Sequence, residues 1–103
     1  MDIDVSQITG ISQSALVEIK SAIFSEQDVA EAVIFGSRAK GTWKEFSDID
    51  ISLKGENVTH QTIVNILNRL QDTDIPYIID LNRYDAITNE ALRSHIDRIG
   101  IRL

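Results

Sequence analysis

Residues 48–53 alternate strictly between polar and apolar side chains, a pattern that a half-buried β-strand accommodates and a helix does not. Successive side chains of a strand point to opposite faces, so the apolar set can enter a core while the polar set faces outward. The apolar set is Ile49, Ile51 and Leu53, and the polar set is Asp48, Asp50 and Ser52. The chain must therefore build a sheet with one face buried against other elements.

Hydrophobic spacing predicts the elements that surround this strand. We expect helices over 12–24 and 63–70 and from Thr88 onward, one helical turn over 37–40, and strands over 31–35 and 77–81. The predicted order is α-β-α-β-α-β-α, an α/β (α+β) class with a small mixed β-sheet and flanking helices. With 103 residues, the chain is expected to form a single domain over 1–103.

Composition excludes several classes of protein. The chain is 43% hydrophobic and 25% charged with no cysteine, which is typical of a globular protein without disulfides or thiolate metal sites. The first residues, Met1 to Asp4, lack a basic segment followed by an apolar run, so we expect no signal peptide. No apolar stretch is long enough to span a membrane. We therefore expect a cytoplasmic protein.

The net charge of −6 argues against direct nucleic-acid binding by this chain alone, because such binders present a basic face. The charge is unevenly distributed. Residues 36–55 carry four basic and three acidic residues, a net of +1, whereas the remainder carries six basic and thirteen acidic residues, a net of −7. The segment that is not acidic is the one in which a phosphate site is predicted below.

Asp48 and Asp50 lie two positions apart on one strand, so their side chains point the same way with Cα atoms about 6.5–7 Å apart. Asp80 lies on the polar face of its own predicted strand, and the three carboxylates converge if the two strands are neighbours. Such oxygen ligands suit Mg²⁺, with Mn²⁺ as a substitute. Two ions held there would clamp the attacking and leaving oxygens of a phosphoryl or nucleotidyl transfer.

Gly36 and Ser37 supply a matching half. A glycine at the end of a strand lets backbone N–H groups approach a phosphate closely, and the Ser37 hydroxyl can donate to a phosphate oxygen. Arg38, Lys40 and Lys44 are close enough in sequence to neutralise a triphosphate. We take Arg38 and Lys40 as candidate nucleotide-binding residues, although surface basic residues are also common.

Each candidate has a simpler alternative. Asp48 and Asp50 are read as surface carboxylates if the pair is taken in isolation. An EF-hand does not fit residues 48–59, because Leu53 stands where glycine is required and Thr59 where glutamate should close the loop. Asp85 is a nearby rival to Asp80, which its strand context favours.

Two residue types are assigned no chemistry. His60 and His95 have no spacing to each other or to a nucleophile that indicates a triad, so both are interpreted as structural or exposed. Trp43 lies in the 41–47 loop, where it could stack on a base, although an anchor for the loop is the favoured interpretation.

The segment GSRAKGTWKEFSDIDISL resembles the signature of the polymerase-β-like nucleotidyltransferase superfamily, and more closely its small stand-alone branch, the minimal nucleotidyltransferases (MNT). The resemblance extends through DIPYIIDL and the last helix. It implies that Asp48 and Asp50 bind Mg²⁺, that Asp80 completes the site and helps activate an acceptor hydroxyl, and that Gly36 and Ser37 hold the triphosphate. It also implies a helical HEPN-type partner protein, in some cases within a toxin–antitoxin pair.

The leading hypothesis is a metal-dependent enzyme that transfers a nucleoside monophosphate, AMP from ATP, to an acceptor hydroxyl. The acceptor is expected on another polypeptide, because no added domain for it is visible. The rival hypothesis is a non-catalytic masking module, an antitoxin or regulator, with a vestigial metal site. The C-terminal run from Ile96 to Leu103 is expected mainly to pack on the domain's own sheet, with a partner contact as the alternative.

Overall fold

The computed structural model describes residues 4–103, so the first three residues of the acidic N-terminal stretch lie outside the described residues. The helices are α1 (Val5–Thr9), α2 (Gln13–Phe24), α3 (Gly36–Lys40), α4 (His60–Gln71) and α5 (Glu90–Ile99), with a 3₁₀ turn, η1 (Tyr84–Ala86). The strands are β1 (Glu31–Phe35), β2 (Ile49–Lys54), β3 (Ile79–Arg83) and β4 (Ile101–Arg102). No helix among residues 4–103 has the length and apolar composition needed to cross a membrane.

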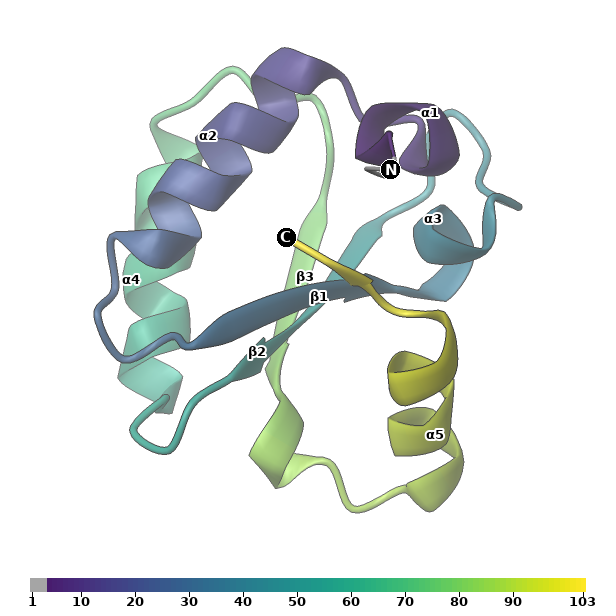
Figure 1. Cartoon of the computed structure of the whole chain (residues 1–103). Coiled ribbons are helices and arrows are strands. Elements are labelled where there is room, and N and C mark those ends of the chain that lie inside the picture. The colour runs from purple at the N-terminus through teal and green to yellow at the C-terminus, as the bar shows by residue number, and fades with distance from the viewer. Residues whose placement is uncertain (1–3) are drawn as a thin grey trace.

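The four strands form one mixed sheet in the order β3-β2-β1-β4 (Figure 1). β1 runs antiparallel to both β2 and β4, whereas β2 and β3 are parallel. A parallel pair needs a long crossover connection, and α4 supplies it between β2 and β3. The predicted class, a small mixed sheet with flanking helices, is confirmed.

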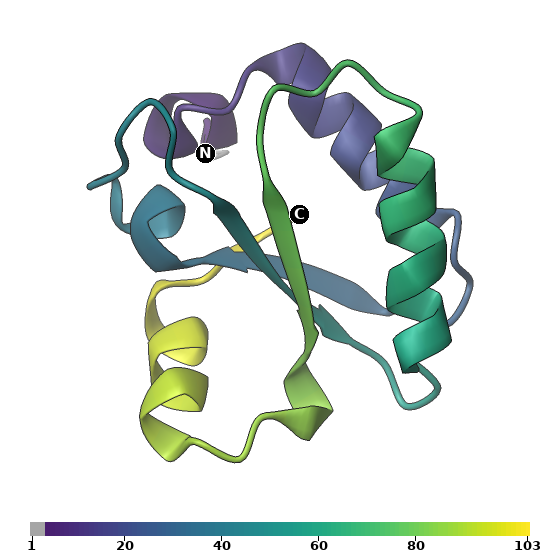
Figure 2. The ribbon, with the colours of Figure 1, turned by 180° about the vertical axis from the view of Figure 1, so that it is seen from behind.

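The two faces of the sheet are covered differently. α2 and α4 lie side by side over one face, and α5 lies on the other (Figures 1 and 2). The larger core forms under α2 and α4 and includes the apolar set of the alternating strand, Ile49, Ile51 and Leu53. A smaller cluster forms under α5 from Val33, Phe35 and Ile96. The polar face of β2 therefore lies on the side that α5 covers only in part.

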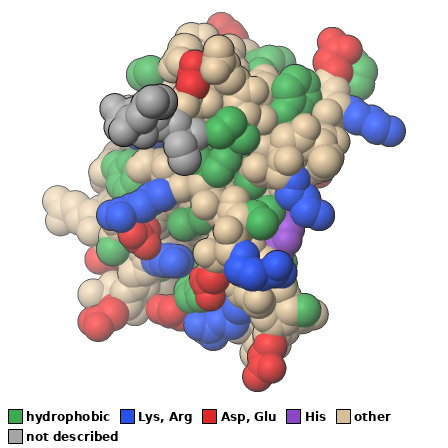
Figure 3. Space-filling model, turned by 45° about the vertical axis from the view of Figure 1, so that its right-hand side comes forward, with side chains coloured by type: hydrophobic (Ala, Val, Ile, Leu, Met, Phe, Trp, Pro, Cys, Tyr) green, Lys and Arg blue, Asp and Glu red, His purple; other side chains and the backbone are tan. Residues whose placement is uncertain are grey.

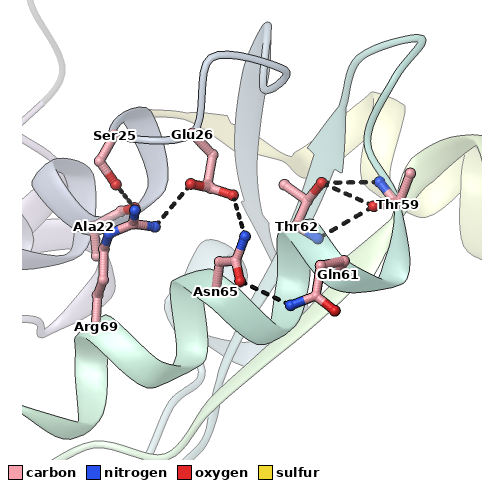
Figure 4. A network of polar contacts seen from close by, with 8 residues as sticks. All are labelled: Ala22, Ser25, Glu26, Thr59, Gln61, Thr62, Asn65 and Arg69. Carbon is pink, nitrogen blue, oxygen red and sulfur yellow. Dashed lines mark hydrogen bonds and ion pairs between the residues drawn. The ribbon is translucent and has the colours of Figure 1, made fainter.

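Polar contacts fix the outer edge of the α2–α4 layer (Figure 4). Glu26, just beyond α2, accepts hydrogen bonds from Asn65 (2.9 Å) and Arg69 (2.8 Å) of α4. The Asn65 hydrogen bond, followed by the Arg69 bond, lowers the pKa of the Glu26 carboxyl. At its start, α4 is closed by a capping box between Thr59 and Thr62.

Several elements differ from the prediction in their presence or their bounds. The helix over 12–24 is confirmed as α2, with Ser12 as its N-cap, but α1 and η1 are not predicted. The third strand begins at Ile79, two residues later than expected, and the Tyr77 hydroxyl before it contacts the α1–α2 connection. The C-terminal run pairs with β1 as β4, which confirms its packing on the domain's own sheet.

Candidate active site

The polar face of β2 brings the end of β1 and the start of β3 together. Phe35, the last residue of β1, is the Cα partner of Asp50, and Asp50 is in turn the Cα partner of Asp80. Gly36 directly follows Phe35. Three segments that are distant in sequence therefore meet at Asp50.

Gly36 is required at this point for two separate reasons. Its φ of +72° lies in the left-handed region that favours glycine. A Cβ atom built on Gly36 would also lie 2.5 Å from the Asp50 Oδ2 atom, well inside van der Waals contact. The backbone of the Gly36–Ser37 turn therefore lies directly against the Asp50 carboxylate, which couples the predicted phosphate-binding turn to the predicted metal ligands.

The three carboxylates occupy neighbouring positions with different exposure. Asp48 is exposed just before β2, Asp50 is half-buried, and Asp80 is exposed on β3. β2 and β3 are adjacent, as the expectation required, and Asp50 is paired with Asp80. That all three carboxylates form one site stays a prediction. Asp85, the rival of Asp80, lies beyond β3 in η1 and outside that register.

The environment of Asp50 raises the pKa of its carboxyl group. Burial raises the pKa of the Asp50 carboxyl, and the nearby Asp80 and Asp48 carboxylates raise it further, while His95 acts in the opposite direction. A cation placed among the three would relieve this repulsion, and carboxylate oxygens are the ligands that Mg²⁺ prefers. Within residues 4–103, no group of three or more His, Cys, Asp or Glu side chains is placed so that it could hold a metal ion as the chain stands. The carboxylates offer adjacent ligands on an open face.

The other predicted nucleotide-binding residues lie on α3. Ser37 follows Gly36 and is half-buried, and Lys40 is exposed at the end of the helix. Figure 3 shows the side of the molecule that carries α3 and α5, where Lys and Arg side chains gather around a histidine. Positive charge on this side suits an anionic ligand, although the chain as a whole is acidic.

Arg38 has a different place from the one predicted. Its side chain is only 1% exposed, and its guanidinium donates to the backbone carbonyls of Thr9, Glu45 and Ser47 at 2.9–3.4 Å. Enclosed in this way, the guanidinium has almost no exposed surface to offer a phosphate. We therefore correct the expectation of direct phosphate contact: Arg38 ties α3 to α1 and to the loop that leads into Asp48.

Trp43 is the second anchor of that loop. Its indole N–H donates to the Ile8 carbonyl at 2.9 Å, and its ring lies where a Cβ on Gly10 would be. The Arg38 guanidinium carbon lies 5.1 Å from the centroid of the Trp43 ring and 5.2 Å from that of the Tyr77 ring. The structure thus supports the loop-anchor interpretation of Trp43. The contacts of Arg38 with Trp43 and Tyr77 hold the loop that leads to β2.

His95 is the residue that the sequence interpretation missed. Its Nε2 atom accepts the backbone N–H of Gly36 at 3.2 Å, from a position 59 residues later in the chain. His60 is exposed at the start of α4, in agreement with its interpretation. No spacing rule links a histidine on a C-terminal helix to a distant glycine turn, so only the folded arrangement reveals this contact.

The polar face continues below the carboxylates. Ser52 and Asn82 are the next register pair on the same face as Asp50 and Asp80. Within the part of the chain that the structure describes, the Ser52 Oγ and Asn82 Oδ1 atoms are buried without a hydrogen-bond partner. Grooves occur elsewhere, for example between α1, α2 and β4, and that groove is not lined by the carboxylates. The candidate site is therefore a polar sheet face that is exposed at Asp48 and Asp80 and buried at Ser52.

Comparisons with known proteins agree with this geometry. The family model described as polymerase beta, nucleotidyltransferase matches residues 17–103. A solved structure described as a toxin–antitoxin with AMP-PNP contains a chain that superimposes with a TM-score of 0.68 at 18% identity. The match covers 84% of this chain and 69% of that one, and at this identity it shows a shared fold. No curated protein matches by sequence.

Proposed function

Because the chain belongs to the polymerase β nucleotidyltransferase family, we propose that it transfers a nucleoside monophosphate from a nucleoside triphosphate to an acceptor hydroxyl. ATP is the proposed donor. The observation that carries this proposal is the meeting of the Gly36 turn, Asp50 and Asp80 through strand register. A turn suited to phosphate beside adjacent carboxylates is what a nucleotidyl transfer needs.

Asp48, Asp50 and Asp80 are the residues that would hold Mg²⁺, as one or two ions, or Mn²⁺ in its place. When bound, the metal would supply positive charge that stabilises the transferring phosphoryl group and the leaving pyrophosphate. The raised pKa of the Asp50 carboxyl, caused first by burial and then by the Asp80 and Asp48 carboxylates, supports this assignment.

The protein's own groups would divide the remaining work. The Gly36–Ser37 turn would hold the triphosphate, with the Ser37 hydroxyl donating to a phosphate oxygen and Lys40 adding charge. Asp80, exposed on β3, would accept the proton of the acceptor hydroxyl. The acceptor oxygen would then form a bond to the α-phosphorus, while the bond from that phosphorus to the bridging oxygen breaks and pyrophosphate leaves.

The acceptor is proposed to lie on a partner protein. The carboxylates occupy an open face, so a second molecule can approach Asp80 without entering a closed pocket. The structural neighbour is described as a toxin–antitoxin with AMP-PNP, an ATP analogue. These observations support a partner protein as the molecule that is modified. An MNT-type role with a HEPN-type partner is proposed from the resemblance of the sequence.

Transfer from labelled ATP tests this proposal. The chain is incubated with Mg²⁺, the product of the neighbouring gene and ATP labelled at either the α- or the γ-phosphorus. Label on the partner from α-labelled ATP alone is the expected result, because nucleotidyl transfer retains the α-phosphorus. Asp80→Asn should abolish labelling, whereas the matched variant Asp85→Asn should retain it.

The same experiment identifies the opposite outcome. Labelling from γ-labelled ATP alone would mean phosphoryl transfer, and equal activity in Asp80→Asn and wild type would remove Asp80 from the reaction. If the partner is neutralised without any label, and neutralisation survives Asp48→Asn and Asp50→Asn, the chain acts as a masking module.

A further inference from the structure

His95 makes a directed contact with the Gly36 turn. The Gly36 N–H donates to His95 Nε2 at 3.2 Å. A ring nitrogen that accepts a hydrogen bond carries no proton, so this contact requires an unprotonated Nε2 atom. The contact joins α5 to the junction of β1 and α3, two parts of the chain that are distant in sequence.

The imidazole is held in place by packing on the same side. Its ring meets Phe35 edge-on, with ring centroids 6.3 Å apart and an interplanar angle of 84°. The neighbouring Ile96 is 1% exposed and packs in the cluster under α5 with Val33 and Phe35. The position of Nε2 is therefore set by a packed helix rather than by a free side chain.

The Gly36 peptide gains an orientation from this contact. Gly36 has a φ of +72°, and a glycine can adopt many other backbone conformations at little cost. An acceptor for its N–H favours one orientation of the peptide plane between Phe35 and Gly36. The same residue lies against the Asp50 carboxylate, where a Cβ would come within 2.5 Å of Oδ2. A change in the conformation of the turn would therefore move the backbone that contacts the Asp50 carboxylate. His95, by holding Gly36, restrains the turn and its contact with Asp50.

We propose that His95 is a positioning residue of the triphosphate site, in which its Nε2 atom holds the Gly36–Ser37 turn in the orientation that receives the phosphates. This assignment rests on the proposed nucleotidyl transfer. His95 acts through Gly36 and does not itself contact the reacting atoms.

A competing role for His95 predicts the opposite change in nucleotide affinity when the imidazole is removed. If the imidazole and the phosphates competed for the Gly36 N–H, removing the imidazole would strengthen nucleotide binding. If it positions the turn, removing it weakens binding. Nucleotide affinity therefore distinguishes the two roles.

Two variants isolate the acceptor atom. His95→Gln retains a side-chain acceptor that reaches the position of Nε2, whereas His95→Leu retains apolar contact with Phe35 but has no acceptor. His60→Leu, at the exposed start of α4, is the matched control. Calorimetric titration with ATP and Mg²⁺ should show about tenfold weaker binding for His95→Leu, the effect of one hydrogen bond, with recovery in His95→Gln. In turnover, KM for ATP should rise in His95→Leu more than kcat falls.

Tighter or unchanged binding in His95→Leu would overturn the proposal, as would equal weakening in both His95 variants. A through-hydrogen-bond coupling between the Gly36 amide nitrogen and His95 Nε2, measured by NMR, checks the contact independently of activity. Its absence from the wild-type protein overturns the proposal even if His95→Leu does not fold. Wild-type protein that binds no ATP would contradict the proposed function, whereas wild-type binding with no His95 effect contradicts only this inference.

Discussion

Asp50 and Asp80 are Cα partners on adjacent parallel strands, and this register places two carboxylates side by side on the open face of the sheet. Asp50 is half-buried and also adjoins the Gly36 turn. One strand position thus links the proposed phosphate-binding turn, the proposed metal ligands and the proposed base.

The raised pKa of Asp50 has a direct consequence for stability. Because the folded-state pKa lies above the unfolded value, the folded protein binds more protons between those two pH values, and the free energy of unfolding falls as pH rises through them. Above that window the ionised carboxylate is a constant cost. Asp50→Asn removes it, so we expect a higher melting temperature at neutral pH and a weaker pH dependence, measured by thermal unfolding.

Mg²⁺ provides the complementary test of the same residue. A cation that binds only the folded state stabilises it. We expect Mg²⁺ to raise the melting temperature of the wild-type protein and to have little effect on Asp50→Asn. Equal stabilisation of both proteins would place the metal elsewhere.

Gly36 and Gly41 form a matched pair for mutation. Both have left-handed φ values, +72° and +77°, but a Cβ on Gly36 meets Asp50 at 2.5 Å, whereas a Cβ on Gly41 meets its nearest atom at 4.0 Å. We expect Gly41→Ala to cost about 1–2 kcal/mol of stability from backbone strain alone, with ATP binding retained. Gly36→Ala should cost more and abolish ATP binding. Denaturant unfolding and nucleotide titration measure the two effects; similar losses of binding in both variants would contradict the role of the Gly36–Asp50 contact.

Arg38 and Lys40 are expected to have different roles: Arg38 stabilises the fold, and Lys40 contributes to ATP binding. Arg38→Met removes the donors to three backbone carbonyls and the cation–π contacts with Trp43 and Tyr77. We therefore expect a loss of about 3 kcal/mol in the free energy of unfolding. Lys40→Met, at an exposed position, should leave stability nearly unchanged and weaken ATP binding severalfold. An Arg38 variant of unchanged stability would refute the structural assignment.

Local patterns were sufficient for the parts of the fold near the site. Alternation over 48–53 indicates a strand with Asp50 on its polar face, and the same reasoning places Asp80 on the polar face of β3, because side-chain direction in a strand follows from position alone. Whether the two strands are neighbours is a question of topology, which the pattern leaves conditional. The structure answers it through the α4 crossover.

Long-range contacts account for what the sequence did not indicate. Arg38 has the appearance of a surface cation, and its burial depends on carbonyls from α1 and from the 42–47 loop. His95 reaches Gly36 only once α5 is packed under β1. β4 has two residues, too few for a periodic signal. In each case the partner, rather than the residue itself, determines the role.

Paramagnetic mapping with Mn²⁺ tests most directly the claim that the three carboxylates and the Gly36 turn form one metal–triphosphate site. Low concentrations of Mn²⁺ are added with ATP to the labelled protein, and the broadening of each backbone amide signal is measured. We expect the strongest broadening at Asp48, Asp50 and Asp80, extending to Gly36 and Ser37, and its loss in Asp50→Asn. Broadening centred on another acidic segment, or unchanged by Asp50→Asn, would contradict the account.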